Sequence, residues 1–378
     1  MIFLRSKEYL YMICAEYFDI NKIIDIKELT TGNINETYVV IFEKCKYILQ
    51  LLNSHVYYSP IGVMNNTRLI VDHIRKKCIY NGQNPHRSVL SFIKTIHNQD
   101  LAIIDNEYWR CSEYIENAYS LETVSTSEEF YQIGRGIGNF QNLLSDFYTN
   151  LLDDTIKNFH NTAFRYEKFK ETIELDKYDR VKMCLNEISF IKERSKKFSI
   201  ITDKIKMGVI PSRVTHNDTK ASNVMLDKKT KEYLCLIDLD TVMKGSLLFD
   251  YGDALRYGAS KVSEDEENLE LVDIDMNLFE SFTKGFLEEL KNSITKEEIK
   301  LLYEGIWMIT IELGMRFLHD FLDGDRYFRI TKPAHNLIRA KNQLQLIKKI
   351  EEKELIIKNK INDILRELEY DIDNMIVL

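Results

Sequence analysis

The sequence predicts an α+β protein in two lobes, a small antiparallel β-sheet lobe over residues 1–115 and a larger, mostly helical lobe over residues 116–378. β-rich runs separated by turns are concentrated in the first 115 residues, whereas helical periodicity dominates the rest. The chain has 378 residues, which is too long for one small core. Its 44% apolar and 29% charged residues are ordinary for a globular protein.

The first lobe is expected to contain a sheet and two helices. Residues 1–20 form an amphipathic pattern with aromatic residues on one face, and residues 60–78 repeat apolar residues at helical spacing. Between them, residues 24–52 contain β-rich runs on either side of turns, which is typical of hairpins. The other expected elements are a loop at residues 81–87 and strands at residues 88–96, 101–104 and 108–115.

The second lobe is predicted to begin after the joint Ile115-Glu116-Asn117. Glycines alternate in its first expected helix, at residues 134, 136 and 138. Because glycine in a helix costs ~1 kcal/mol relative to alanine, we expect close packing by another helix there. Residues 260–274 are acidic, lack a helical stripe and are predicted to form a solvated loop. The expected helices span residues 127–150, 166–176, 179–204, 275–292, 296–322 and 336–368.

Composition and charge exclude several classes of function. With 51 Lys and Arg against 59 Asp and Glu, the net charge of −8 argues against broad binding to nucleic acid or to an anionic membrane. The six cysteines include no C-x-x-C pair, so neither a zinc site nor a redox motif is predicted. The N-terminal segment is interrupted by charges, and no apolar run reaches the ~18–20 residues that span a bilayer. We therefore expect a cytoplasmic protein; the sequence carries no signal for its oligomeric state.

A polar loop followed by a strand carries the strongest chemical signal. His216-Asn217-Asp218, with Asn223 five residues after Asp218, matches the kinase catalytic-loop spacing H-x-D-x-x-x-x-N. The Asp218 carboxylate suits a base that takes the proton of an attacking hydroxyl. Because Mg²⁺ prefers hard oxygen ligands, the amide of Asn223 and the carboxylate of Asp238, which ends an apolar run, are candidate ligands.

The alternative is an ordinary surface loop, because Asp and Asn are common in turns. A second acidic set, Asp250-Tyr251-Gly252-Asp253, favours the catalytic interpretation. His216 is expected to brace the loop rather than take part in chemistry.

Two further segments are candidates for nucleotide binding. The turn around Gly32 could donate backbone N–H groups to phosphates, although a simple turn fits it as well. In two-lobed kinases the link between the lobes reads the adenine edge, and an ordinary strand-to-helix joint is the alternative here. The candidate residues are Gly32, Asn33, Asn35, Thr37, Gln50, Glu113, Tyr114 and Ile115.

Several stretches carry a resemblance to a known family. They are GNINETY (32–38), YILQLLN (47–53), NFHNT (158–162), HNDTKASNVMLD through FDYGD (216–253), GMRFLHDFLDGDRYF (314–328) and HNLIR (335–339). The chain resembles the aminoglycoside phosphotransferase and choline kinase superfamily, and within it bacterial N-acetylhexosamine 1-kinases. The resemblance implies a protein-kinase-like fold and transfer of the ATP γ-phosphoryl group, with Mg²⁺, to the anomeric hydroxyl of N-acetylglucosamine or N-acetylgalactosamine.

The resemblance also implies roles for individual residues. Asp218 would be the base and Asn223 and Asp238 the Mg²⁺ ligands, with Asp240 assisting metal or substrate. The residues that would bind the sugar are Arg316, Asp320, Asp325, Tyr327 and His160. Their segment mixes charge signs among aromatic residues, which favours a neutral sugar over a cationic aminoglycoside. A plain salt bridge between Arg316 and Asp320, four residues apart on a helix, is the alternative for that pair.

One position departs from the protein-kinase pattern. Gln50 stands where the phosphate-pairing lysine is expected, and the helix at residues 60–78 offers no glutamate to pair with a lysine. The phosphate contact is then left open among the turn backbone, Gln50, Lys46 and Arg68. Other acceptors, namely an aminoglycoside, choline or an amino-alcohol, and a nucleotide-binding pseudokinase remain alternatives.

Overall fold

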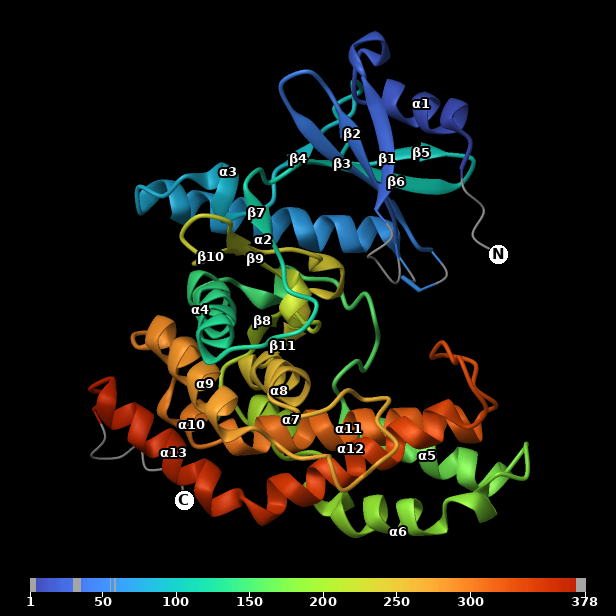
Figure 1. Cartoon of the computed structure of the whole chain (residues 1–378), viewed down its shortest axis with the longest axis vertical. Helices are drawn as coiled ribbons and strands as arrows, with labels where there is room; N and C mark the ends of the chain where they lie inside the picture. The colour runs from blue at the N-terminus through green and yellow to red at the C-terminus, as the bar shows by residue number, and fades with distance from the viewer. Residues whose placement is uncertain (1–4, 30–34, 55, 58, 372–378) are drawn as a thin grey trace.

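The computed structural model describes residues 5–29, 35–54, 56–57 and 59–371. It confirms the predicted α+β class, because a small antiparallel sheet comes first in the chain and a mostly helical part follows (Figure 1). The predicted turn residues Gly32 and Asn33 lie outside the described residues.

The N-terminal sheet has the strand order β1-β2-β3-β6-β4, with β5 paired to β6. Successive side chains of a strand point to opposite faces. Leu49, Trp109 and Cys111 therefore pack with α1 in one core cluster, and Arg110 points to the opposite face. The elements of this region are α1 (Lys7–Ala15), β1 (Asp25–Leu29), β2 (Glu36–Ile41), β3 (Lys46–Leu52), α2 (Pro60–Tyr80), α3 (Pro85–Ser88), β4 (Phe92–Ile93), β5 (Ala102–Ile104) and β6 (Glu107–Glu113).

Two segments of this region differ from the prediction. The strand expected over residues 88–96 contains only β4, and the expected loop before it holds the short helix α3. Asn84 caps that helix by accepting from the His86 N–H, and Pro85 supplies a favourable first helical residue. The described part of the first helix begins at Lys7, after its N-cap Ser6.

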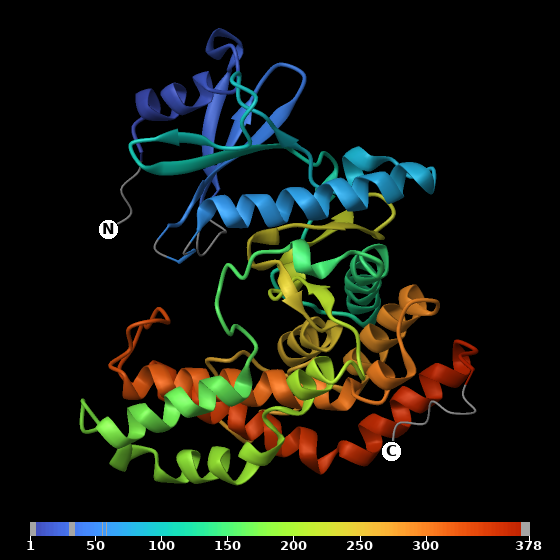
Figure 2. The same ribbon diagram turned by 180° about the vertical axis from the view of Figure 1, so that it is seen from behind.

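Helix α2 packs on the helical lobe rather than within the core of the sheet. Its apolar residues Ile70, Val71 and Ile74 belong to the large C-terminal core cluster. The Asn66 amide donates to the carbonyl oxygens of residues 153 and 242, at 2.8 and 3.0 Å. In both views α2 lies between the sheet and the helices below it (Figures 1 and 2). The apolar face of α2 therefore belongs to the core of the helical part, although α2 precedes the predicted boundary near residue 115.

The C-terminal lobe is built around the buried helix α11 and two small antiparallel sheets, β10-β9-β7 and β11-β8. Its short strands carry the candidate catalytic residues at their ends. The elements of this lobe are β7 (Ala118–Tyr119), α4 (Ser127–Leu143), α5 (Thr162–Leu175), α6 (Leu185–Arg194), α7 (Ile200–Lys206), β8 (Arg213–Thr215), β9 (Val224–Asp227), β10 (Tyr233–Leu236), β11 (Met243–Gly245), α8 (Leu247–Gly258), α9 (Met276–Leu290), α10 (Lys296–Ile299), α11 (Leu302–Leu322), α12 (His335–Glu352) and α13 (Glu354–Glu367).

The glycines of α4 pack as predicted against another helix. A Cβ on Gly138 would lie 2.6 Å from the backbone oxygen of Phe286, and one on Gly134 would meet the oxygen of Phe282. Both oxygens belong to α9, so the two helix backbones approach each other closely. Gly136 faces Val224 of the neighbouring sheet instead.

Three of the expected long helices are interrupted, and the one expected over residues 296–322 divides into α10 and α11. The segment 179–204 divides into α6 and α7, because the Ser195 hydroxyl bonds the Lys192 carbonyl and a short 3-10 turn follows. The segment 336–368 divides at Lys353, whose ammonium pairs with Asp273 in the loop before α9. That loop, residues 260–274, contains no helix or strand, as predicted.

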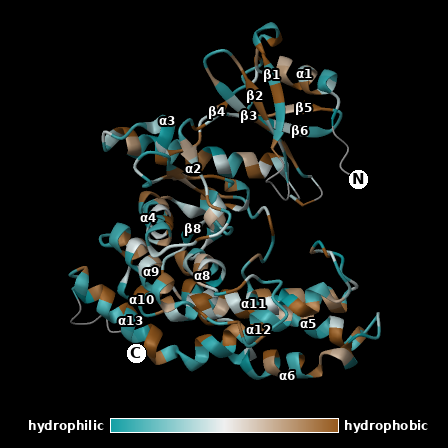
Figure 3. Cartoon of the chain, viewed as in Figure 1, coloured by the Kyte–Doolittle hydropathy of each residue, from teal (hydrophilic) through white to brown (hydrophobic). Residues whose placement is uncertain are grey.

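Hydrophobic (brown) and hydrophilic (teal) residues alternate along many of the helices (Figure 3). No helix in the described part of the chain combines the length and apolarity needed to cross a membrane.

Candidate active site

The loop that carries Asp218 is held from beneath by α8. It follows β8, and the backbone N–H groups of His216 and Asn217 each donate to the Asp250 carboxylate at 2.9 Å. Asp253 accepts from the Thr219 N–H at 3.2 Å. The acidic set after Asp238 therefore braces the loop. The His216 ring is fully buried and contacts the Ile237 carbonyl at 2.9 Å, which is the predicted bracing role.

Asp218 is partly exposed and makes directed polar contacts. Its Oδ2 accepts from the Asn223 amide at 2.8 Å and from the Lys220 ammonium at 2.9 Å. The Asn223 amide also donates to the Asp218 backbone oxygen at 2.8 Å. Burial works against the charge of Lys220, but the neighbouring carboxylates, led by Asp218, raise its pKa. The carboxylate is thus fixed in orientation and stands beside a cation.

Asp238 adopts a left-handed backbone conformation directly after β10, with φ of 59° and ψ of 55°. Few non-glycine residues adopt this region, although Asp and Asn do so more readily than most. Burial and the negative charges of Asp240 and Asp218 raise the pKa of Asp238 to about 7. The turn therefore brings carboxylates together that repel one another.

This crowding suits a divalent cation. Carboxylate and amide oxygens are hard ligands, and Mg²⁺ commonly takes one or two carboxylates together with waters and substrate phosphates. Among the described residues, no group of three His, Cys, Asp or Glu side chains is arranged as a complete metal site. The predicted pair, Asn223 and Asp238, is smaller than such a group and leaves the other positions to phosphate and water.

The predicted nucleotide residues lie on the inner face of the sheet. Thr37, Gln50 and Arg110 are direct neighbours across β2, β3 and β6. Gln50 donates to the Thr37 hydroxyl at 3.1 Å. Asn35 donates to Asp240 at 2.6 Å and accepts from the N–H of residue 53. Asn35 and Asp240 therefore connect this sheet to the turn that carries Asp238.

The three residues predicted to link the lobes, Glu113, Tyr114 and Ile115, differ in whether their N–H groups already have an acceptor. Glu113 donates to the Ser91 carbonyl at 2.8 Å, and Tyr114 donates to the Lys46 carbonyl at 3.1 Å. Among the described residues, none accepts from the N–H of Ile115. Of the three, Ile115 is therefore the residue whose N–H has no acceptor in the described part of the chain.

Arg316 and Tyr327, which are predicted to bind the sugar, come together within an aromatic cluster. The Arg316 guanidinium carbon lies 5.4 Å from the ring centres of Phe159 and Phe328, and 5.7 Å from that of Tyr327. Within the described part of the chain, Arg316 has no ion-pair partner, so it does not form the salt bridge with Asp320. Cation–π contacts of this kind fix the plane of a guanidinium while leaving its N–H edges for other partners.

His160 joins the same cluster through Glu312. Its Nδ1 lies 2.9 Å from Glu312, whereas its buried Nε2 has no hydrogen-bond partner among the described residues. Burial opposes ionisation of Glu312, but the charges of His160, Arg165 and Arg316 hold its pKa below the usual value. Burial and the positive charge of Arg316 lower the pKa of Arg165 to about 10. Two arginines therefore stand close together here.

Asp320 and Asp325 use their carboxylates to hold the segment that follows α11. Asp320 accepts backbone N–H groups from residues 326 and 327 at 2.8 Å and from residue 328 at 2.9 Å. The Asn336 amide donates to both carboxylates at 2.9 Å. Asp325 also pairs with Arg180 at 2.6 Å. These contacts position Tyr327 and Phe328 beside Arg316.

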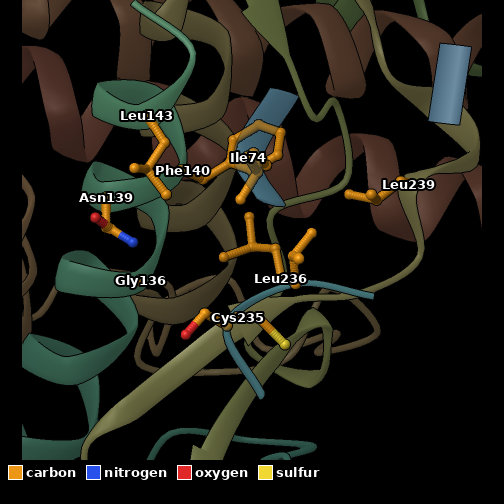
Figure 4. Close-up of a pocket in the computed structure, with 10 residues that line it drawn as sticks. Ile74, Gly136, Asn139, Phe140, Leu143, Cys235, Leu236 and Leu239 are labelled. Atoms are coloured by element: carbon orange, nitrogen blue, oxygen red, sulfur yellow. The ribbon is translucent and has the colours of Figure 1, made fainter. Parts of the chain in front are cut away.

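The aromatic cluster around Arg316 is connected to the loop that carries Asp218. The His160 ring packs on the ring of Phe249, with centres 4.9 Å apart, and Phe249 precedes the Asp250 that holds the loop. A separate small pocket lies between α2, α4 and β10, where Phe140 and Leu236 point inward (Figure 4). None of its ten lining residues is a predicted site residue, so we assign it to core packing.

Sequence reasoning missed two cations of the site. Lys220 was within the recognised motif, two residues after Asp218, and a basic residue so close to a catalytic carboxylate was an available signal. Arg110 was the second, and its signal was a charge in the middle of the strand expected over residues 108–115. Its partners, Gln50 and Asp240, are far away in the chain, so only the sheet register reveals them.

Comparison with known proteins gives the fold a name. Residues 190–274 match the model of the phosphotransferase enzyme family. An aminoglycoside phosphotransferase of Alicyclobacillus acidocaldarius matches with a TM-score of 0.58 and 13% identity, over 98% of each chain. A choline kinase of Cryptosporidium parvum matches with a TM-score of 0.55 and 15% identity, over 97% of this chain and 99% of that one.

The fold is that of aminoglycoside phosphotransferases and choline kinases. A third similar structure is a spectinomycin phosphotransferase in complex with ADP and spectinomycin. Its TM-score is 0.52 at 11% identity, over 92% of this chain and 99% of that one. The matched family segment covers the catalytic loop, Asp238 and α8, where the predicted chemistry is concentrated.

Proposed function

We propose that the chain is an ATP- and Mg²⁺-dependent kinase that phosphorylates a hydroxyl group of a small molecule. One observation carries the proposal: the Asp218 carboxylate is held between Asn223 and Lys220, close enough to Asp238 for the two charges to interact. The match of residues 190–274 to a phosphotransferase family and the kinase-like fold support it.

In this proposal each residue has a defined task. Asp218 accepts the hydrogen bond and then the proton of the acceptor hydroxyl, which makes that oxygen a better nucleophile. Asn223 and Lys220 keep the carboxylate in one orientation, and Lys220 also places positive charge beside the transferred phosphoryl group. Mg²⁺, held by Asn223 and Asp238, would neutralise phosphate charge. The N–H of Ile115 reads the adenine edge.

The acceptor that we propose is an N-acetylhexosamine, N-acetylglucosamine or N-acetylgalactosamine, phosphorylated on its anomeric hydroxyl. Arg316 can donate to the acetamide carbonyl or to ring hydroxyls, and Tyr327, Phe328 and Phe159 offer apolar faces to a pyranose ring. The unpartnered Nε2 of His160 adds a polar group near the same cluster.

Cationic acceptors are the second candidate, because the similar structures include a choline kinase and aminoglycoside phosphotransferases. The charges of the cluster argue against them. Arg165 and Arg316 are near enough that the charge of one lowers the pKa of the other, and Glu312 is their shared carboxylate. An amine would enter this region against two like charges.

An acceptor panel tests the proposal. Purified protein is given ATP and Mg²⁺ with N-acetylglucosamine, N-acetylgalactosamine, glucose, choline, ethanolamine, aminopropanol and an aminoglycoside, and ADP release is measured. We expect turnover of the N-acetylhexosamines, with phosphorus NMR showing phosphate on the anomeric carbon. Turnover of amines alone would overturn the sugar assignment, and ATP binding without turnover of any acceptor would favour a pseudokinase.

The matching variant is Asp218→Asn, which retains size and loses the basic carboxylate. We expect turnover to fall by at least about a hundredfold, the lower range of a general base's contribution, with no change in the far-ultraviolet circular dichroism. Asp363→Asn, which removes an exposed carboxylate on α13, is the control and should leave turnover unchanged. Full activity of the Asp218 variant would eliminate Asp218 as the base.

A further inference from the structure

The inner face of the N-terminal sheet carries a buried arginine at the end of a line of polar side chains that are joined by hydrogen bonds. Arg110 lies opposite Gln50 in the β3–β6 register, and Gln50 lies opposite Thr37 in the β2–β3 register. Arg110 donates through Nε and Nη2 to the Gln50 side-chain oxygen at 3.1 and 3.0 Å. Gln50 in turn donates to the Thr37 hydroxyl, which fixes the orientation of its amide. The strand position where a lysine is expected therefore holds a neutral residue that orients a neighbouring arginine.

The remaining edge of this arginine faces the turn that carries Asp238 and Asp240. Its Nη1 lies 2.5 Å from Oδ1 of Asp240, two residues after Asp238. The contact is an ion pair without hydrogen-bond alignment, because neither atom has a hydrogen-bond partner among the described residues. The guanidinium also packs on the Phe92 ring, 5.5 Å from its centre. Its plane is therefore held on two sides while Nη1 keeps donor capacity.

The two cations that the sequence offers for phosphate contact, Lys46 and Arg68, form ion pairs elsewhere. Lys46 pairs with Glu116 at 3.1 Å near the hinge, and both side chains are exposed. Arg68 pairs with Asp72 and Asp100, at 3.2 and 3.5 Å. Neither approaches the turn of Asp238 in the contacts of the described residues. Arg110, by contrast, forms an ion pair with Asp240, two residues after Asp238.

We infer that Arg110 is the cation of the N-terminal lobe that binds the nucleotide phosphates, in place of the missing lysine. The inference rests on the proposed kinase function. Gln50 retains Nε and one edge of the guanidinium, and the Nη1 edge exchanges Asp240 for phosphate oxygens. A guanidinium is suited to this exchange because its donors lie in a fixed plane that matches both carboxylate and phosphate.

Access to Arg110 requires one further contact to open. The side chain of Arg110 is 4% exposed and that of Asp240 is 1% exposed, and Asn35 donates to the other oxygen of Asp240 at 2.6 Å. Phosphate entry would break the Asn35–Asp240 bond and turn the carboxylate away. The ion pair thus balances the charge of the buried guanidinium until an anion replaces Asp240.

Binding measurements with the whole protein test the inference. Calorimetry compares adenosine, ADP and ATP with Mg²⁺ on the natural protein, Arg110→Met and Arg110→Lys. We expect the methionine variant to bind ADP and ATP about tenfold to a hundredfold more weakly, with adenosine affinity unchanged, since the lost contact is charge-assisted. The lysine variant, which keeps the charge but loses the fork, should fall between. Arg68→Met is the matched control and should bind all three like the natural protein.

The other outcomes decide between a structural role and a phosphate-binding role for Arg110. Equal weakening of adenosine and ADP would show that Arg110 only supports the fold, and unchanged ADP affinity would show that it does not touch phosphate. If the methionine variant does not fold, wild-type ADP affinity in the lysine variant overturns the inference, and a phosphate-selective loss supports it. If the natural protein itself binds ADP no better than adenosine, the proposed kinase function fails together with the inference.

Discussion

Replacing Asp320 by asparagine tests whether this residue positions the acceptor site or touches the acceptor. The carboxylate is 6% exposed and accepts four hydrogen bonds. Oδ1 receives the N–H groups of residues 326 and 327, and Oδ2 receives the Phe328 N–H and the Asn336 amide. Asparagine can keep one pair but turns an NH₂ group toward the donors of the other pair.

The size of the effect follows from those contacts. Hydrogen bonds to a charged group contribute about 1.5–3 kcal/mol each, so the two lost bonds place an upper range of about 3–6 kcal/mol on the cost. Relaxation of the segment after α11 reduces this, and we expect about 3 kcal/mol. If about half of it appears as disorder of Tyr327 and Phe328 in the free protein, the KM for the acceptor rises about tenfold.

Initial rates at varied acceptor and at varied ATP, together with thermal unfolding, measure both parts. We expect a higher acceptor KM, an unchanged ATP KM and a lower midpoint of unfolding. Asp323→Asn is the matched control, because it removes a half-exposed carboxylate from the same segment. A raised acceptor KM with unchanged stability would show that Asp320 contacts the acceptor directly. A folded variant with an unchanged acceptor KM would refute both roles.

Two further predictions concern stability. Gly138→Ala should destabilise the fold by about 1–3 kcal/mol despite its better helix propensity, since the new Cβ would lie 2.6 Å from the Phe286 oxygen. Gly136→Ala, which meets a rotatable side chain at 2.8 Å, should cost less in the same urea titration, and the reverse order would contradict the packing argument. Arg213→Met should cost about 3–5 kcal/mol, because it leaves the fully buried Glu298 without its bidentate partner. A loss below that of an exposed-pair variant such as Lys168→Met would refute this reasoning.

The arrangement of the candidate catalytic loop, residues 216–223, could be predicted because its geometry is local. The spacing from His216 to Asn223 and the strand before Asp238 are written within one short stretch, and the structure joins Asp218 to Asn223 as that stretch indicates. Element types were predictable for the same reason, since each depends on a window of neighbouring residues. The breaks at Ser195 and Lys353 were not, because a side chain competes with the backbone at one and a distant carboxylate pairs at the other.

The cation of the sheet could not be predicted from spacing. Gln50 and Arg110 meet because β6 lies beside β3 in the sheet, and a sequence window shows neither that order nor the register. The roles of Asp320 and Asp325 depend equally on Asn336, a residue from the next helix. Resemblance placed these residues near a sugar, whereas their contacts place their carboxylates behind Tyr327 and Arg316.

The charges of the site suggest why both lobes are needed. Asp218, Asp238 and Asp240 interact unfavourably, which raises the pKa of Asp238, and the counter-charges come from Lys220 on one side and Arg110 on the other. Lys220 belongs to the same loop as Asp218 and stays with it, whereas Arg110 reaches the cluster only while the sheet rests against the C-terminal lobe. A ligand that brings positive charge to the carboxylates and negative charge to Arg110 can replace both partners of the Arg110–Asp240 ion pair. A magnesium–nucleotide complex has this charge distribution, so we expect its binding to change the contact between the lobes as well as to fill the site.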